Sequence, residues 1–313
     1  MSVQVSSTTP GLAPAVLTGA YVTLDQLLAL RHKAVAQSTS VPPRVVGNQA
    51  GLKLSKIKGR GVDFAEVRAY QPGDDIRSID WRVTARKNKP HTKIFREERE
   101  RPSLIVVDQS QNMFFGSKLR LKSVVAAELA ARIAWQNLAA GDRVGGVVIG
   151  NDNQHVHRPY RTTKALARLL NDVALFNNKL ERSQIDPAAS IHEGMLRVRR
   201  LTHTNYRIFV LSDFSGELEG WRENLHQLAR HNQVVVVHIH DPLEEQLPPA
   251  DHYVVTDGVD RLQFYTGDRA LRARYAERFH QHTEALKSLC AHQAMLYIGI
   301  QTNDENLDQM TWA

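Results

Sequence analysis

Four polar residues lie at or just after the ends of two short apolar segments. Asp108, Ser110 and Asn112 come at and after the end of SLIVVD, and Asp213 closes RIFVLSD. Their carboxylate, hydroxyl and amide oxygens are hard ligands, which suit Mg²⁺, Ca²⁺ or Mn²⁺. If both segments are parallel strands, their carboxyl ends meet at one edge of a sheet, where ligands bind. The spacing therefore predicts a divalent-cation site, with Mg²⁺ as the first candidate cofactor.

A structural interpretation of the same residues stays open. Asp108 and Asp213 could cap helices and brace the strand ends without any metal. Ser110 and Asn112 are also ordinary turn and cap residues, because their short side chains hydrogen-bond to the nearby backbone.

A second concentration of charge lies in AYQPGDDIRSIDWRVTARKNKP, residues 69–90. Three aspartates and three arginines surround a Trp, a Tyr and a Pro-Gly turn. We expect paired charges that fix Tyr70 and Trp81 against the core, and docking of a partner protein is the rival interpretation. The residues of this signature are Tyr70, Pro72, Gly73, Asp74, Asp75, Arg77, Asp80, Trp81 and Arg86.

An enzymatic role is a weaker alternative. Acidic residues of this region could hold Mg²⁺ near a basic surface, as in a metal-dependent hydrolase or nuclease. These are Asp74, Asp75, Asp80, Glu97 and Glu98. However, the arginines lie close enough in sequence to neutralise them, and no nucleophile–base pair is evident. The sequence also lacks a GxxxxGK[ST] phosphate loop. We therefore expect no enzymatic activity, and ATP hydrolysis only from a partner.

The chain before residue 102 differs in character from the rest. Residues 1–20 are rich in Ser, Thr, Pro and Ala and predict a disordered tail. We assign residues 21–101 to an N-terminal helix, a linker and a β-containing appendage. The helix begins at a Thr23-x-x-Gln26 capping box. Residues 303–313 are expected to form a C-terminal tail.

The signature itself predicts a short helix. Ile76, Ile79 and Val83 have the spacing of one helix face, and Asp74 or Asp75 after the Pro-Gly turn is a good N-cap. The alternation of Ile79 and Val83 with a Trp between them leaves a strand open as an alternative.

From residue 103 the pattern becomes α/β. Continuous apolar runs are typical of strands buried on both faces, and amphipathic or Ala-rich stretches between them are typical of helices. The alternation predicts a doubly wound, mostly parallel sheet flanked by helices, over residues 102–302. The predicted strands are 103–108, 144–149, 155–159, 207–213, 234–240 and 295–300. The predicted helices are 117–139, 162–172, 187–200, 217–231 and 268–290.

Composition and charge limit the function classes. The 313 residues include one cysteine, which excludes an internal disulfide and suits a reducing compartment. No secretory signal and no apolar run of about 20 residues is evident, so we expect a cytoplasmic protein without a membrane span. Residues 51–101 carry 14 Lys+Arg against 8 Asp+Glu, which accounts for most of the net charge of +7. Sequence-independent nucleic-acid binding by this segment stays an alternative, although it lacks interleaved aromatic residues.

The combined motifs resemble a known family. Asp108-x-Ser110-x-Asn112 is similar to the D-x-S-x-S motif of von Willebrand factor A-type domains, with Asp213 as the second aspartate of their metal-ion-dependent adhesion site. The runs GRGVDF, PGDDxRxIDW and GDRVG resemble the domain of unknown function 58 family, over roughly residues 45–300. The resemblance implies a von Willebrand A-like fold with an N-terminal β-containing appendage.

The resemblance also implies partners and a site. It implies a non-enzymatic adaptor that works with a MoxR-type AAA+ ATPase, and other von Willebrand A-like or membrane-associated proteins are further partners. Two residues depart from the adhesion-site pattern. Asn112 replaces a serine, and Ile185 stands where a third loop should supply a threonine. The departures leave the metal site incomplete, and the source of a third-loop hydroxyl is open.

Overall fold

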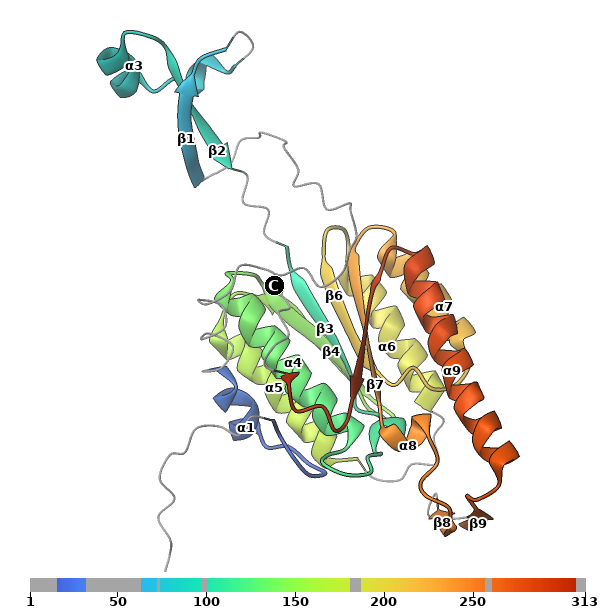
Figure 1. The fold of residues 1–313 in the computed structure, drawn as a ribbon. Helices are drawn as coiled ribbons and strands as arrows, with labels where there is room; N and C mark the ends of the chain where they lie inside the picture. The colour runs from blue at the N-terminus through green and yellow to red at the C-terminus, as the bar shows by residue number, and fades with distance from the viewer. Residues whose placement is uncertain are drawn as a thin grey trace, which may run out of the picture. The chain divides into compact units, whose positions relative to one another are not determined.

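The computed structural model describes residues 16–31, 63–71, 74–96, 101–180, 187–256 and 261–307 (Figure 1). These residues form two compact units. The large unit combines the first range with everything described from residue 101 onwards, and the small unit comprises what is described between residues 63 and 96.

The large unit is built on a six-stranded sheet in the order β10-β7-β6-β3-β4-β5. The first five of these strands are parallel, and β5 pairs antiparallel with β4 at one edge. The strands are β3 (Ser103–Asp108), β4 (Val144–Ile149), β5 (Gln154–Tyr160), β6 (Arg207–Ser212), β7 (Gln233–His240) and β10 (Leu296–Gln301). The strand order reverses between β3 and β6, so the carboxyl ends of these two strands border the crevice where such sheets bind ligands.

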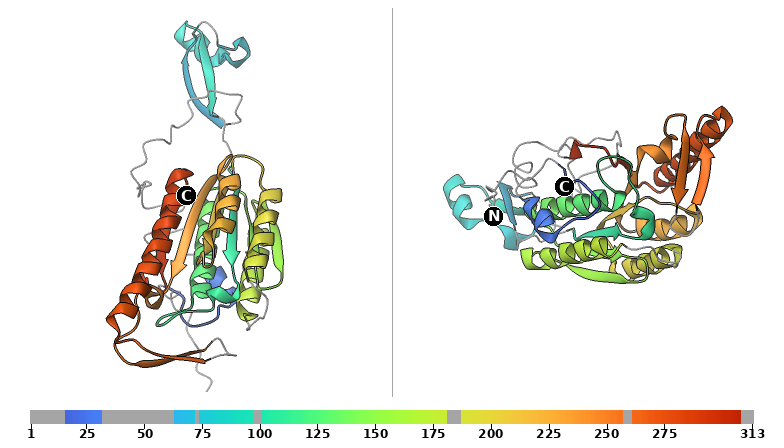
Figure 2. Two further views of the ribbon diagram at one scale, coloured as in Figure 1. Left: turned by 90° about the vertical axis from the view of Figure 1, so that its right-hand side faces the viewer. Right: turned by 90° about the horizontal axis from the view of Figure 1, so that it is seen from below.

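Helices cover both faces of this sheet (Figures 1 and 2). One face packs against α4 (Lys122–Ala139) and α5 (Thr163–Asn178). The other packs against α6 (Pro187–Leu201), α7 (Leu218–Ala229) and α9 (Arg269–His292).

The side chains of β3 show why its sequence is continuously apolar. Ile105 and Val107 belong to the core on the α4 side, whereas Leu104 and Val106 belong to the core on the α7 side. A strand buried on both faces needs apolar residues at every position. The predicted doubly wound α/β fold is confirmed, and the predicted edge strand at 155–159 is β5.

The sequence analysis grouped the N-terminal helix with the appendage of residues 21–101, whereas the structure places this helix in the large unit. Helix α1 (Leu24–Ala29) has the predicted capping box at Thr23, but it packs on the large unit. Leu27 is fully buried, and its carbonyl oxygen accepts a hydrogen bond from the Trp135 indole at 3.1 Å. Val16, in the predicted N-terminal tail, is also buried in this core. Apolar residues of a short amphipathic helix need a surface to cover, and α4 and α5 provide it.

Other differences lie near the C-terminal end. A hairpin of β8 (His252–Thr256) and β9 (Arg261–Tyr265) follows the short helix α8 (Pro242–Glu245), and the sequence did not predict either element. Leu307, in the predicted C-terminal tail, is fully buried. Residues 308–313 and 1–15 lie outside the described residues. Among the described helices, none has both the length and the apolar character that a bilayer crossing requires.

The small unit is a two-stranded antiparallel sheet with two short helical turns. Its elements are β1 (Asp63–Ala69), the 3-10 turn η1 (Ile76–Ser78), α3 (Trp81–Lys87) and β2 (His91–Arg96).

The single helix predicted for the signature is two separate turns. The Asp75 carboxylate caps η1 by accepting a hydrogen bond from the backbone N–H of Arg77 at 3.0 Å. Asp80 caps α3 in the same way, through the N–H of Arg82 at 3.0 Å. The backbone of Ile79, between the two turns, is extended, with a ψ angle of 127°. Two Asp caps close together each favour a new helix start, so the helical face is interrupted.

Candidate functional site

Asp108 is the last residue of β3 and is buried at the carboxyl edge of the sheet. Its Oδ1 accepts a hydrogen bond from the backbone N–H of Ser110 at 2.9 Å, and its Oδ2 accepts one from the Ser212 hydroxyl at 2.6 Å. Burial, and then the nearby Asp213 carboxylate, raise the pKa of Asp108 to about 6. Both oxygens of this predicted ligand therefore have partners within the protein.

Asp213 follows β6 and is held by a cation that belongs to the chain itself. Its Oδ1 accepts a hydrogen bond from the backbone N–H of Ser215 at 3.0 Å. Its Oδ2 lies 2.7 Å from the ammonium of Lys122, which also lies 2.6 Å from a carboxylate oxygen of Glu244. Burial opposes ionisation of Asp213, but the Lys122 charge outweighs it and lowers the pKa of this carboxyl below its usual value.

Lys122 is the functional residue that sequence reasoning missed. It is the first residue of α4 and only 2% exposed. Burial disfavours its charge, but Asp213 and Glu244 together raise the pKa of this lysine, so it stays charged. A lysine in the first turn of a helix opposes the helix dipole. The sequence did not show this placement, because the predicted helix begins at residue 117, so no signal in the sequence pointed to a buried carboxylate partner.

The other two predicted ligands lie in the loop after β3. The hydroxyl of Ser110 is buried and has no hydrogen-bond partner among the described residues. The side-chain amide of Asn112 donates to the Ser215 hydroxyl at 2.8 Å. The structure therefore brings the four predicted residues to the same end of the sheet, and Ser215 links two of them, Asn112 and Asp213.

This donor set does not suit a divalent ion as it stands. An ion bonded to the same oxygen of Asp213 would lie no more than about 5 Å from the Lys122 ammonium. Repulsion between charges of +2 and +1 at that distance is on the order of 7 kcal/mol in an effective dielectric of about 20. No group of three or more His, Cys, Asp or Glu side chains in the described part of the chain is arranged for a metal. Metal binding stays a prediction, and it requires Lys122 to move.

The remaining hydroxyl expected of an adhesion site cannot be assigned. The third loop, residues 183–186, lies outside the described residues, and Ile185 with it.

The signature of the small unit differs from the predicted charge network. Arg68 pairs with Asp74 at 2.7 Å, but Arg77 and Arg86 form no ion pair with any residue that the structure describes. Trp81 is 69% exposed on the small unit, and its predicted packing against the core stays a prediction. The physical reason for this exposure is that a two-stranded sheet offers too little surface to cover the side chains of both helical turns.

Three further residues of the signature complete this comparison. Tyr70 is half-buried, and its backbone N–H donates to the carbonyl of Pro90 at 2.8 Å. Pro72 and Gly73 lie outside the described residues, as do Glu97 and Glu98.

The comparison with known proteins covers parts of both units. A family model described as "Protein of unknown function DUF58" matches residues 66–285. An uncharacterized protein of Mycobacterium bovis is 30% identical over 245 residues, which cover 78% of this chain and 75% of that relative.

Two solved structures are similar to the chain at a distance. One is BatB, a conserved hypothetical protein from Bacteroides thetaiotaomicron. It is 15% identical, with a TM-score of 0.38, and the match covers 67% of this chain and 94% of that chain. The other is the SpRpn10 VWA domain, which is 11% identical with a TM-score of 0.35, over 64% of this chain and 88% of that chain. Neither likeness adds to the assignment of the fold, which follows from the strand order.

Proposed function

Because this chain belongs to the DUF58 family, whose function is unknown, and has a von Willebrand A-like fold, we propose that it is a non-enzymatic protein-interaction module. The proposed partner is a MoxR-type AAA+ ATPase, as the sequence resemblance implies. The chain has no glycine-rich phosphate loop of its own, so an ATP-driven step would be the work of that partner.

The observation that carries this proposal is the exposure of two large apolar side chains on the small unit. Ile76 is 66% exposed and Trp81 is 69% exposed, although both belong to consecutive helical turns of the signature. Exposed apolar side chains with a charged rim mark protein-interaction sites, and Trp is enriched among the residues that dominate binding energy. We call Ile76, Trp81 and the basic residues around them the docking surface.

The charge of the docking surface indicates the partner's chemistry. Five exposed basic residues form no ion pair with any described residue, so a binding partner can supply the acidic groups. They are Arg77, Arg82, Arg86, Lys87 and Lys89. A partner that fits would present an apolar pocket with carboxylates around it. Nucleic acid would satisfy the charge but would leave Ile76 uncovered.

We also propose that partner capture needs no divalent ion. The sequence alone predicts a Mg²⁺ bridge to a partner carboxylate. The Lys122 ammonium supplies a positive charge at the same carboxylate, Asp213, which is therefore paired without a metal. The von Willebrand A-like unit then acts as a rigid scaffold, and the docking surface makes the contact.

The experiment is capture of the source organism's MoxR-type ATPase by the immobilised full chain. Replacing Trp81 by Ala, or Ile76 by Ala, should weaken capture at least roughly 30-fold, because central interface residues contribute about 2 kcal/mol or more. Addition of EDTA should have no effect on capture by the unmodified chain.

The matched control is Leu175→Ala, which removes an exposed apolar side chain from α5 of the large unit. This variant should capture the ATPase as well as the unmodified chain does. Equal capture by Trp81→Ala and the unmodified chain would contradict the docking surface. Loss of capture in EDTA would contradict its independence from metal.

A further inference from the structure

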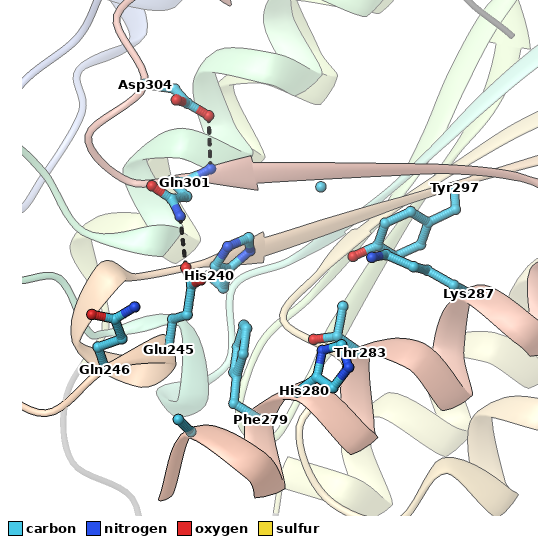
Figure 3. A pocket seen from close by; sticks show the side chains of 12 residues that line it. His240, Glu245, Gln246, Phe279, His280, Thr283, Lys287, Tyr297, Gln301 and Asp304 are labelled. Atoms are coloured by element: carbon cyan, nitrogen blue, oxygen red, sulfur yellow. Dashed lines mark hydrogen bonds between the residues drawn. The ribbon is translucent and has the colours of Figure 1, made fainter. Parts of the chain in front are cut away.

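A cavity of about 530 Å³ lies between α9 and the carboxyl ends of β7 and β10 (Figure 3). Its walls include His240 from β7, Thr283 from α9, and Tyr297 and Gly299 from β10. A Cβ on Gly299 would lie 3.3 Å from the Tyr297 hydroxyl, so a larger residue would narrow the space. Glycine within a strand often marks a position where a ligand approaches the backbone.

Two polar atoms in these walls lack a partner. The Oγ1 of Thr283 and the Nδ1 of His240 are buried and accept or donate no hydrogen bond within the described part of the chain. Thr283 as a whole is only 8% exposed, and Figure 3 shows it among the side chains that line the cavity. Buried polar atoms are rarely left unpaired, so a bound group or solvent must satisfy them.

The walls of the cavity carry two carboxylates, those of Glu245 and Asp304. Glu245 has no cationic partner among the described residues, and its carboxylate only accepts a hydrogen bond from the side chain of Gln301 at 3.0 Å. Asp304 also lines the cavity, although the buried guanidinium of Arg120 lies near it. One lysine, Lys287, also lines the cavity, and it is paired at 2.8 Å with Glu284, which does not line it.

Aromatic rings complete the walls. The Lys287 ammonium lies 5.7 Å from the centre of the Tyr297 ring, so that ring already attracts a cation. The ring of Phe279 packs 5.2 Å from that of His240, which burial keeps neutral by lowering its pKa. A neutral imidazole can accept a hydrogen bond, as the Thr283 hydroxyl can.

We propose that this cavity binds a positively charged guanidinium or ammonium group. Such a group carries several N–H donors and a charge that the Glu245 carboxylate attracts, and its flat or compact form packs against aromatic faces. An anion would meet two carboxylates, and an apolar group would leave Thr283 and His240 without partners. The group can come from an arginine or lysine side chain of a protein, or from a free polyamine.

The test uses the isotope-labelled full chain and two-dimensional amide NMR. N-acetyl-arginine methylamide should shift the backbone amides of Thr283, Gly299 and Gln301. N-acetyl-citrulline methylamide has the same shape without the charge. Its affinity should be lower than that of the arginine probe by a factor of roughly ten or more, since a charged hydrogen bond is lost. Spermidine in a parallel titration distinguishes the sources: tighter binding of the arginine probe assigns a protein side chain, and tighter binding of spermidine a free amine.

The decisive variant is Glu245→Gln, which keeps the hydrogen bond to Gln301 available but removes the charge. It should weaken the arginine probe roughly tenfold. The matched control is Glu219→Gln on α7, whose side chain is 75% exposed and far in sequence from the cavity. Absence of shifts at these amides, or equal binding of the citrulline probe, would overturn the proposal. So would unchanged binding by Glu245→Gln. The ATPase capture experiment does not depend on this cavity, so each proposal can fail alone.

Discussion

The ammonium of Lys122 lies 2.7 Å from the carboxylate of Asp213, and both side chains are buried. The lysine comes from the start of α4 and the aspartate from the end of β6, so the pair ties together two sides of the crevice at the strand ends. Glu244 of α8 joins the same ammonium at 2.6 Å. One of the residues that the sequence presents as metal ligands, Asp213, thus belongs to an internal ion cluster.

The first prediction concerns metal binding by the purified full chain. Because Lys122 already neutralises Asp213, we expect no specific Mn²⁺ binding, measured by the loss of the free Mn²⁺ signal in electron paramagnetic resonance. Ser110→Ala removes one predicted ligand whose hydroxyl has no hydrogen-bond partner among the described residues. Mn²⁺ binding that weakens in Ser110→Ala would restore the metal site that the sequence suggests.

The second prediction concerns Lys122 itself. Lys122→Met keeps the length of the side chain but leaves two carboxylates without their cation, which typically costs about 3 to 5 kcal/mol of unfolding free energy. Mn²⁺ should then raise the melting temperature of the variant and not that of the unmodified chain. A folded Lys122→Met that gains nothing from Mn²⁺ would mean that the lysine is not what excludes the ion.

The third prediction separates two tryptophans. Trp81→Ala should change the free energy of unfolding by no more than about 0.5 kcal/mol, because the side chain is mostly exposed. Trp221→Ala removes a side chain that is 5% exposed and packs on Phe214, so it should cost about 3 to 5 kcal/mol. Urea denaturation of both variants checks this contrast. A large loss in Trp81→Ala would show that the residue packs on something the described chain does not include.

The fourth prediction concerns pH. Burial, and then the neighbouring His240, lower the pKa of His238 from 6.5 to about 3. Below pH 6.5 the unfolded chain therefore binds a proton that the folded chain excludes, and stability falls as the pH falls. Between pH 7 and pH 5 this group should remove about 2 kcal/mol of unfolding free energy.

The variant for this test is His238→Gln, which cannot take up a proton but can still hydrogen-bond to Tyr297. Between pH 7 and pH 5 the unmodified chain should lose about 2 kcal/mol more stability than His238→Gln does, as measured by urea denaturation at both pH values. Parallel pH profiles for both chains would assign the acid sensitivity to other groups.

The fifth prediction concerns two glycines. A Cβ at Gly145 in β4 would lie 2.4 Å from the backbone oxygen of His157 in β5, so Gly145→Ala should destabilise the sheet edge by about 1 to 3 kcal/mol. Gly220 in α7 has nothing within 4 Å, and Gly220→Ala should stabilise the helix by up to about 1 kcal/mol. The melting temperature should fall for Gly145→Ala and rise for Gly220→Ala. A shift in the same direction for both variants would contradict this prediction.

The strands of the large unit were predictable because burial on both faces leaves a plain signal. SLIVVD and VGGVVI are apolar or small at every position, and each is a central strand of the sheet. The hairpin of β8 and β9 gave no such signal, because its exposed residues, such as Val254, alternate with polar ones over only a few positions.

The candidate site was predictable only in part. Asp108 and Asp213 stand at strand ends, and strand ends can be read from an apolar run. Lys122 could not be placed, because a lysine at a helix start looks like an ordinary surface residue until its carboxylate partners are known. The size of Trp81 suggested burial, but within the small unit a two-stranded sheet offers too little surface to cover it.

The position of the small unit along the chain has a mechanical consequence. The chain runs from β2, which ends at Arg96, to β3, which begins at Ser103. β3 is held between β4 and β6 by two parallel ladders. A partner that pulls on the small unit therefore loads a central strand, and a pull along that strand shears many backbone hydrogen bonds together instead of opening them one after another. The same strand ends at Asp108, so traction on the docking surface would be felt at the ion cluster.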